Sequence, residues 1–346
     1  MRSIERLRST AGSLALLFAL CMPNALVAQG ASGSSVARPT RAKASGSVHT
    51  DTLWAQSLGI TKALTVYLPP SYHKSPSRRY PVLVYLHGLT GNERNWVEQG
   101  ALGRTLDSLS AAGKPEAIVV MPDGDDGWYS TWNQLVDASV CRSDTTRREP
   151  AATYCVPWPH YDDYIANDIV SHVDRQYRTR PGPASRGIAG LSMGGYGAVT
   201  LALSYPHVFG AAASHSGVLS PRVIGPQPFA TPARYASSAE ELRLSTGSRY
   251  RWLLPVFGRD TIGWVARDPG RMAARLKRKH VAVPALLIDC GIDDPYIDQN
   301  RDLHSTLQKL GIAHRYKEWP GTHDWAYWRA HSPESLAFLL ERVSHR

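Results

Sequence analysis

Ser192 is the residue of this sequence whose surroundings most directly indicate covalent chemistry. It lies in the stretch GIAGLSMGGYG, with Gly190 two residues before it and Gly194 two residues after it. An apolar run precedes this stretch and an apparent helix follows it, and Gly-x-Ser-x-Gly at such a junction is typical of a nucleophile elbow. That turn presses backbone segments together, so bulky side chains do not fit two positions to either side. The pattern predicts that the Ser192 hydroxyl stands clear to attack, with a helix N-terminus favouring negative charge nearby.

A serine hydroxyl needs a base, and the base needs an acid that orients it. In a fold with this elbow the acid and then the base follow the serine along the chain. Five histidines follow both Ser192 and the candidate acids described below, and four of them stand in predicted helices, at the start of a strand or in the C-terminal tail: His304, His331, His314 and His345. The fifth, His323, follows the last predicted strand on a turn opened by Pro320 and Gly321. We therefore expect His323 to be the base; the alternative is a helix-entry residue beside an N-cap at Asp324.

The acid is expected directly after the strand that precedes the last one. The stretch LLIDCGIDDPYID offers four aspartates there. Asp289 falls within the strand, and Asp298 begins a helix that it could cap. Asp293 and Asp294 lie on the loop at the strand end, and the pattern alone does not choose between them.

The negative charge that grows on a reacting carbonyl oxygen needs two preorganised amide donors. The amide of Met193, directly after the candidate nucleophile, is expected to be one. The second is expected from the turn after VLVYLHGLTG, where Gly88 lets the chain turn sharply and directs the Leu89 amide to the same point. Taken alone, this His-Gly pattern is better explained by an ordinary strand-ending turn.

These residues need a scaffold of alternating strands and helices. Apolar runs predict strands within 63–70, 80–88, 116–124, 185–190, 210–217, 284–291 and 314–321. Helical spacing predicts helices within 161–177, 194–206, 297–311 and 325–343. The alternation indicates an α/β fold with a mostly parallel central sheet and helices on both faces.

Two segments interrupt this alternation, at about 125–160 and 218–265. Both are rich in Pro, Trp, Tyr and Arg, and we expect them to be loop insertions over a binding site rather than separate domains. Trp128 and Trp325 are the candidate substrate-lining residues, with simple aromatic packing as the alternative.

The N-terminus indicates export. Three arginines stand among the first eight residues, and the apolar run 11–20 is too short to span a bilayer. Residues 1–28 are therefore expected to be a cleaved signal peptide, which leaves no stable membrane span and a periplasmic or extracellular protein. Residues 29–50 are rich in Gly, Ser and Ala and are expected to be a flexible linker, followed by a catalytic domain over 51–346.

Charge and cysteines exclude other classes of function. The formal net charge is +10, but the densest basic run, 275–280, lacks the aromatic residues of a nucleic-acid module and fits a solvated helix end. A disulfide between Cys141 and Cys155 is expected in an oxidising compartment, and Cys290 is expected to be a buried thiol. No spacing of cysteines and histidines suggests a metal, and the acidic stretch PDGDDG fails the calcium-loop pattern.

Taken together, these stretches resemble the α/β-hydrolase superfamily, specifically the esterase D or "putative esterase" family. That family includes S-formylglutathione hydrolases, feruloyl esterases, tributyrin and other short-chain acyl esterases and, more distantly, mycolyltransferases. The resemblance runs from about Val66 to Trp328, through VYLPPSY, RYPVLVYLHGLTG, VVMPDG, RGIAGLSMGGYGAVTLAL, DCGIDDP and PGTHDWAYW. It implies an α/β-hydrolase fold.

The resemblance also implies roles for single residues. Ser192 corresponds to the nucleophile and His323 to the base. The family's acid falls on the last aspartate of CGIDDP, which selects Asp294 and leaves Asp293 in reserve. Leu89 and Met193 match the positions of the oxyanion amides.

The implied function is a secreted serine carboxylesterase that works through an acyl-enzyme without metal or cofactor. Its substrate would be a small-molecule or glycan-linked ester. One alternative is an acyltransferase that uses the same acyl-enzyme, as mycolyltransferases do. Another is a thioesterase like S-formylglutathione hydrolase, although Gly91 stands where those cytosolic enzymes have a cysteine. A catalytically silent binding module would show a damaged triad, which this sequence does not.

Overall fold

The computed structural model describes residues 45–132, 142–143, 155–224, 229–247 and 250–343. Contacts divide the chain into Met1–Ala42 and Lys43–Arg346, and everything below concerns the second unit. The predicted signal peptide, most of the predicted linker and Cys141 lie outside the described residues.

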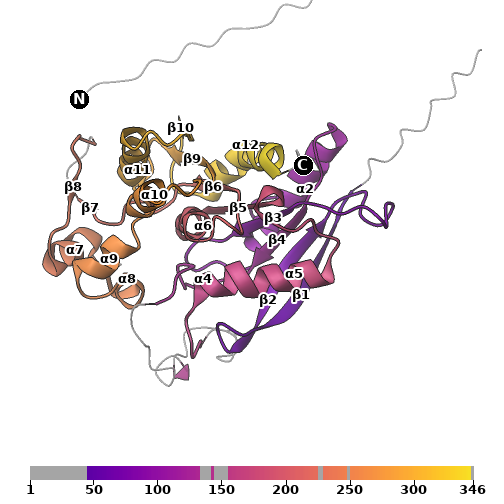
Figure 1. Cartoon of the computed structure of the whole chain (residues 1–346), viewed down its shortest axis with the longest axis horizontal. Coiled ribbons are helices and arrows are strands. Elements are labelled where there is room, and N and C mark those ends of the chain that lie inside the picture. The colour runs from indigo at the N-terminus through magenta and orange to yellow at the C-terminus, as the bar shows by residue number, and fades with distance from the viewer. Residues whose placement is uncertain (1–44, 133–141, 144–154, 225–228, 248–249, 344–346) are drawn as a thin grey trace, which may run out of the picture. The chain divides into compact units, whose positions relative to one another are not determined.

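An eight-stranded sheet forms the centre of this unit, in the order β1-β2-β4-β3-β5-β6-β9-β10 (Figure 1). The six strands from β4 to β10 run parallel to one another. Near one edge of the sheet, β2 runs antiparallel to both of its neighbours, β1 and β4. The fold is therefore an α/β-hydrolase fold, as expected. The strands are β1 (Ser47–Ala55), β2 (Ile60–Leu68), β3 (Val82–Leu86), β4 (Ile118–Pro122), β5 (Arg186–Leu191), β6 (Ala211–His215), β9 (Ala285–Gly291) and β10 (Arg315–Trp319).

The predicted linker boundary at residue 50 is wrong. Strand β1 begins at Ser47, where its backbone pairs with Leu68 of β2. Its first residues are polar and exposed because they form the edge of the sheet, so they carry no apolar pattern. Asp51 ties this edge to the helices through His172 Nε2 at 2.8 Å and the Tyr177 hydroxyl at 2.9 Å.

Helices cover both faces of the sheet, and alternate side chains of each strand enter two separate cores. In β3, Val84 and Leu86 join one core, whereas Leu83 and Tyr85 join the other. The first core is covered by α4 (Tyr161–Asp163), a π-helical turn (Tyr164–Ile169), α5 (Val170–Gln176), α6 (Met193–Ser204), α10 (Pro269–Arg278) and α11 (Ile297–Lys309). The second is covered by α1 (Asn95–Glu98), α2 (Leu102–Ala111) and α12 (Trp325–Val343).

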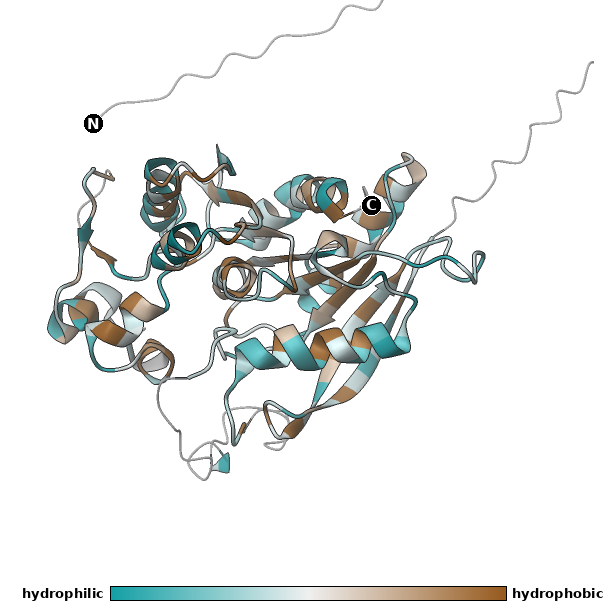
Figure 2. Ribbon diagram, viewed as in Figure 1, coloured by the Kyte–Doolittle hydropathy of each residue, from teal (hydrophilic) through white to brown (hydrophobic). Residues whose placement is uncertain are grey.

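Helix α6 is buried on all sides, since every residue from Met193 to Leu203 is buried. Figure 2 shows hydrophobic residues along the central strands and α6, and hydrophilic ones on the outer face of α5. A helix that is apolar all round must lie inside a domain. The residue directly before it, Ser192, is thus attached to a helix that is buried on all sides.

The second predicted insertion contains three helices and a short strand pair rather than being a loop throughout. It contains the short pair β7 (Val223–Ile224) and β8 (Arg234–Tyr235), then α7 (Ala239–Thr246), α8 (Tyr250–Phe257) and α9 (Thr261–Ala266). Two of these helices, α7 and α9, begin at side-chain caps. Ser238 accepts a hydrogen bond from the Glu241 amide, and Asp260 accepts bonds from Ile262 and Gly263.

Cys155 is disulfide-bonded and Cys290 is a free, buried cysteine. The pairing of Cys155 with Cys141 stays a prediction. Across the described part of the chain, no helix combines the length and apolar character needed to cross a membrane.

Candidate active site

Ser192 occupies a sharp turn between β5 and α6. Its φ is 54° and its ψ is −117°, a conformation that non-glycine residues rarely adopt and that costs about 1–3 kcal/mol. Surrounding backbone holds it there: the Ser192 amide donates to the carbonyl oxygen of His215 at 2.9 Å. A Cβ on Gly190 would lie 2.3 Å from the Gly194 carbonyl oxygen, and one on Gly194 would lie 2.5 Å from two carbonyl oxygens of the β3 end. Both glycines are therefore required by close backbone approach.

His323 reaches Ser192 from the loop after β10. Ser192 follows β5, and β6 and β9 lie between that strand and β10, so this loop must return across the end of the sheet. A pair of glycines lets it cross β9, because a Cβ on Gly291 would lie 2.3 Å from the Gly321 carbonyl oxygen. Gly321 itself has a φ of 137°, which disfavours any other residue. The crossing leaves His323 Nε2 at 2.9 Å from Ser192 Oγ.

Asp294 orients the imidazole. His323 Nδ1 lies 2.8 Å from Asp294 Oδ2, and the Tyr296 amide donates to Asp294 Oδ1 at 2.8 Å. The Asp294 side chain is fully buried, whereas that of His323 is 22% exposed. A buried carboxylate accepting the Nδ1 proton leaves Nε2 free to accept the proton of Ser192 Oγ.

The other three aspartates lie elsewhere. Asp293 is exposed and contacts the His323 loop only through its backbone, whose amide donates to the Gly321 carbonyl oxygen. Asp298 pairs with Arg301 at 3.7 Å. Asp289 is buried in β9 beside His215, with Oδ2 at 2.8 Å from Nδ1.

The expected oxyanion donors lie beside Ser192. Leu89, Met193 and Ser192 line one cavity. A Cβ on Gly88 would lie 3.5 Å from Ser192 Cβ, so the chain enters Leu89 directly against the elbow. Within the residues described, neither the Leu89 nor the Met193 amide donates to a protein acceptor. Two unpaired amides beside a serine hydroxyl can stabilise an oxyanion.

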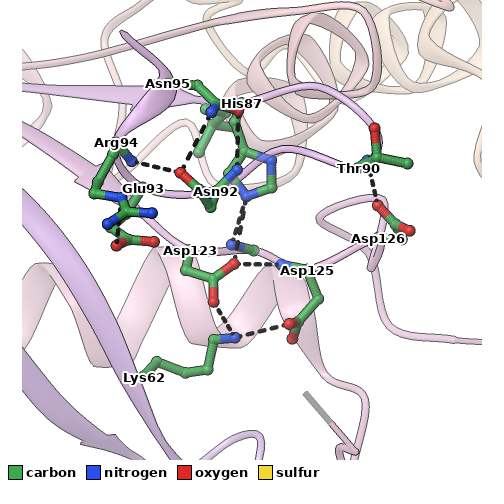
Figure 3. A network of polar contacts seen from close by, with 12 residues as sticks. Lys62, His87, Thr90, Asn92, Glu93, Arg94, Asn95, Asp123, Asp125 and Asp126 are labelled. Carbon is green, nitrogen blue, oxygen red and sulfur yellow. Dashed lines mark hydrogen bonds and ion pairs between the residues drawn. The ribbon is translucent and has the colours of Figure 1, made fainter. Parts of the chain in front are cut away.

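The turn that carries Leu89, residues 87–91, is here called the oxyanion loop, and the loop after β4 braces it (Figure 3). The Gly124 amide donates to His87 Nε2 at 2.9 Å, which leaves His87 Nδ1–H to donate to the Gly88 carbonyl oxygen at 2.8 Å. The Thr90 amide donates to Asp126 Oδ1 at 2.6 Å. The oxyanion loop is thus tied to the β4 loop on both sides of Leu89.

Lys62 of β2 holds the β4 loop in turn. Its buried ammonium group donates to Asp123 Oδ2 at 2.6 Å and to Asp125 Oδ1 at 2.9 Å (Figure 3). Burial opposes the charge of Lys62, but Asp125 and Asp123 outweigh it and raise its pKa. Burial, with the charge of Asp123, raises the pKa of Asp125 to about 6. The acidic stretch PDGDDG therefore serves to fix the loop.

The cavity above Ser192 is mostly apolar. Trp128 of the first insertion lines it, as expected of a substrate-lining residue. Most of the remaining wall comes from the second insertion and from α11 with the turn before it: Val218, Pro221, Val223, Ser245, Thr246, Leu253, Tyr296 and Gln299. The sequence placed this insertion near a site but identified none of these side chains, because they share no motif.

The prediction for Trp325 is wrong. Trp325 is absent from the cavity wall and packs edge-on against Trp96 and Trp328, with ring centroids 5.5 and 5.3 Å away. Its position three residues from Trp328 on α12 directs it to the second core. The aromatic residues beside His323 are instead Tyr296 and Trp328, each with its ring centroid 5.0 Å from the imidazole.

Comparisons with known proteins place this chain among esterases. The model of the family described as "Putative esterase" matches residues 55–339. An acetyl esterase of Caldicellulosiruptor saccharolyticus is 26% identical over 266 residues, which cover 76% of this chain and 84% of that protein. An endo-1,4-beta-xylanase/feruloyl esterase of Xylanibacter ruminicola is 29% identical over 168 residues, which cover 48% of this chain and only 21% of that protein. The solved structure of a ferulic acid esterase covers 86% of this chain and 99% of its own, with a TM-score of 0.60 and 26% identity.

Proposed function

The chain belongs to the "Putative esterase" family and is a hydrolase of ester bonds, and from this premise we propose that it is a serine carboxylesterase working through an acyl-enzyme. Ser192 is the nucleophile, His323 the base and Asp294 the acid that orients it. One observation carries the proposal: a strained serine that lines a cavity has His323 Nε2 at 2.9 Å and, beside it, two amides with no acceptor among the described residues.

The reaction proposed has two halves. In the first, His323 Nε2 takes the proton of Ser192 Oγ, which attacks the ester carbonyl carbon, and the oxyanion receives the Leu89 and Met193 amides. The imidazolium then protonates the leaving alcohol, and an acyl-Ser192 ester remains. In the second half, water loses a proton to His323 and attacks that ester, which releases the acid and restores the serine.

The cavity lining supports an apolar acyl group. The cavity that Ser192 lines has four apolar side chains in its wall: Trp128, Val218, Pro221 and Leu253. Such a wall favours butyryl, longer or aromatic acyl groups over acetyl, since each buried methylene contributes about 0.8 kcal/mol. The relatives are named for acetyl and for ferulic esters, and a panel of acetate, butyrate, octanoate and ferulate esters tests the choice. A kcat/KM highest for acetate would refute an apolar acyl site.

Export is part of the proposal. The apolar N-terminal segment and the disulfide at Cys155 both favour an oxidising compartment. Expression of the full chain and N-terminal sequencing of the mature protein should give a new terminus close after Ala28. An intact N-terminus on cytosolic protein would exclude this part of the proposal.

The central experiment is Ser192→Ala. We expect turnover of p-nitrophenyl butyrate to fall by about 10⁴-fold or more, because only binding and the oxyanion amides would remain. A fluorophosphonate probe should label the wild type at one site per chain and leave the variant unlabelled. Ser237→Ala is the matched control, since that serine is bonded to Glu241 outside the cavity and should be silent. Retained activity in Ser192→Ala would exclude Ser192 as the nucleophile.

The acceptor is tested in the same assay. Alcohols and sugars added at high concentration should leave free acid as the main product if water is the acceptor. New esters formed in preference to free acid would indicate an acyltransferase instead.

A further inference from the structure

His323 is held on the side away from the cavity by an aromatic ring that takes no part in proton transfer. The indole of Trp328 stands edge-on to the imidazole, at an interplanar angle of 88° and a centroid distance of 5.0 Å. His323 itself lies on a short loop between Gly321 and the first turn of α12. Its only polar side-chain partners within the described part of the chain are Asp294 and Ser192. A ring that packs against the imidazole therefore limits how far it can tilt about its bond to Asp294.

Trp328 is in turn fixed by a hydrogen bond rather than by packing alone. Its Nε1–H donates to Ser216 Oγ at 3.1 Å, and the indole is 6% exposed. The Trp325 ring also packs edge-on against the Trp328 indole, with ring centroids 5.3 Å apart. The indole thus has one defined position, in contact with the catalytic base on one side and anchored to the end of β6 on the other.

Ser216 has a costly backbone for a serine. It is fully buried directly after β6 and has a φ of 50°, a region that glycine enters without strain and other residues do not. Its amide donates to the carbonyl oxygen of Asp289 in the neighbouring strand at 2.8 Å. The sequence places glycine at the next position, 217, yet keeps a serine at 216 itself. Glycine would adopt this backbone without strain, but it lacks a hydroxyl group. The presence of serine at a strained position beside the active site therefore indicates that the hydroxyl has a use.

A second aspartate–histidine–serine set lies close to Ser216, and its role is structural rather than catalytic. Asp289, His215 and Ser335 are joined by contacts of 2.8 Å each, in the order of a catalytic triad. All three are buried at 1% exposure or less, so no substrate reaches Ser335. The Tyr327 hydroxyl donates to Asp289 Oδ1 at 3.0 Å, which makes this set a clamp on α12. It does not touch His323.

We propose that Ser216 and Trp328 are positioning residues for His323: the Ser216 hydroxyl fixes the indole, and the indole fixes the imidazole in line with Ser192. The inference rests on the proposed function, since it assigns a task only if His323 is the base. His323 acts in both halves of the reaction, so its misalignment slows acylation and deacylation alike. The substrate cavity is untouched, because neither Ser216 nor Trp328 lines it.

The test is a double-mutant cycle on kcat. Ser216→Gly removes the hydroxyl and relieves the backbone, and Trp328→Phe keeps an aromatic ring but removes the donor. A full 1 Å misplacement of a catalytic group costs about 100-fold, and an imidazole still bonded to Asp294 should lose about tenfold in kcat with KM within twofold. If one hydrogen bond carries both effects, the double variant should also lose about tenfold rather than 100-fold.

Tyr85→Phe is the matched control. The Tyr85 hydroxyl bonds Ser335 Oγ at 3.2 Å, so the variant removes a buried hydrogen bond from the same helix without touching His323. We expect a comparable fall in Tm and an unchanged kcat. Fluorophosphonate labelling to completion counts the folded sites in every variant, so misfolded protein does not enter kcat.

Three results would overturn the proposal: kcat within twofold of wild type in both single variants, independent losses that multiply in the double variant, or a loss carried by KM. Failure of the proposed function is distinguishable, because Ser192→Ala would then retain turnover and the wild type would not be labelled.

Discussion

Replacing Asp294 by asparagine should abolish most of the activity while preserving the fold, because the new amide has only one oxygen for two donors. In the structure one carboxylate oxygen accepts the Tyr296 amide at 2.8 Å and the other accepts His323 Nδ1–H at 2.8 Å. An asparagine that gives its oxygen to Tyr296 presents its NH₂ to Nδ1. The imidazole must then carry its proton on Nε2, which faces Ser192 Oγ at 2.9 Å and can no longer accept a proton.

The magnitude follows from the two orientations of this amide. The opposite orientation restores the working tautomer but brings the NH₂ against the Tyr296 amide in a fully buried position, and two unpaired donors cost about 2–3 kcal/mol. The working tautomer is then populated at about 0.6–3%. Loss of the charge-assisted bond to the imidazolium removes about another 1.5–3 kcal/mol. Together these lower kcat by about 10³–10⁴-fold, in line with the cost of this exchange in serine proteases.

The assay is steady-state hydrolysis of p-nitrophenyl butyrate with circular dichroism as the check on folding. Asp293→Asn is the matched control one residue away: its side chain is exposed, and only its backbone contacts the histidine loop, so kcat should stay within twofold. The reasoning fails if Asp294→Asn keeps more than a tenth of wild-type kcat, or if Asp293→Asn is the variant that loses activity.

Three further predictions concern the surroundings of the elbow. Asp126→Ala removes the acceptor of the Thr90 amide and should lower kcat about tenfold with KM nearly unchanged; an unaltered kcat would show that the oxyanion loop needs no brace. The pKa of Asp125 is raised from 3.8 to about 6, so the folded state holds its proton more tightly and stability is lost as pH rises from about 4 to 6. Urea unfolding should therefore show Asp125→Asn gaining up to about 3 kcal/mol on the wild type between pH 4 and pH 7, and a constant difference would refute this. Gly194→Ala places a Cβ 2.5 Å from two carbonyl oxygens and should cost about 3 kcal/mol or more in unfolding free energy, whereas Gly103→Ala, with no atom closer than 3.7 Å, should be tolerated.

The parts of the site that sequence could predict are those with a local physical signature. Gly190 is required by its contact with Gly194 four residues later, and the last helix appears over 325–343 as its spacing predicts. His323 could be selected because it alone follows a strand at the correct point in the chain order. Each of these features depends on short-range geometry that one stretch of sequence encodes.

The parts that sequence could not settle depend on contacts between distant segments. Asp293 and Asp294 differ in their burial beneath the His323 loop, which no feature of IDDP reveals. Trp325 stands two residues after His323 in the sequence, but its position on α12 directs its side chain to the second core. Strand β1 begins in polar residues whose only reason to be a strand is the pairing with β2.

The features that sequence could predict hold the catalytic residues, whereas those that it could not predict include the wall of the substrate cavity. Ser192 and the histidine loop are attached to β5 and β10 of one parallel sheet, and with only β6 and β9 between them the strand spacing of about 4.8 Å fixes how far apart these two strands lie. Half of the residues that line the cavity belong to the insertion after β6, which forms no part of that sheet: Val218, Pro221, Val223, Ser245, Thr246 and Leu253. A change in the wall can therefore alter which acyl group fits while the serine, histidine and aspartate keep their distances. Substitution of Leu253 should shift the preferred acyl length and leave the rate of labelling by a small fluorophosphonate almost unchanged, which is the pattern expected when specificity and chemistry are held by separate parts of a fold.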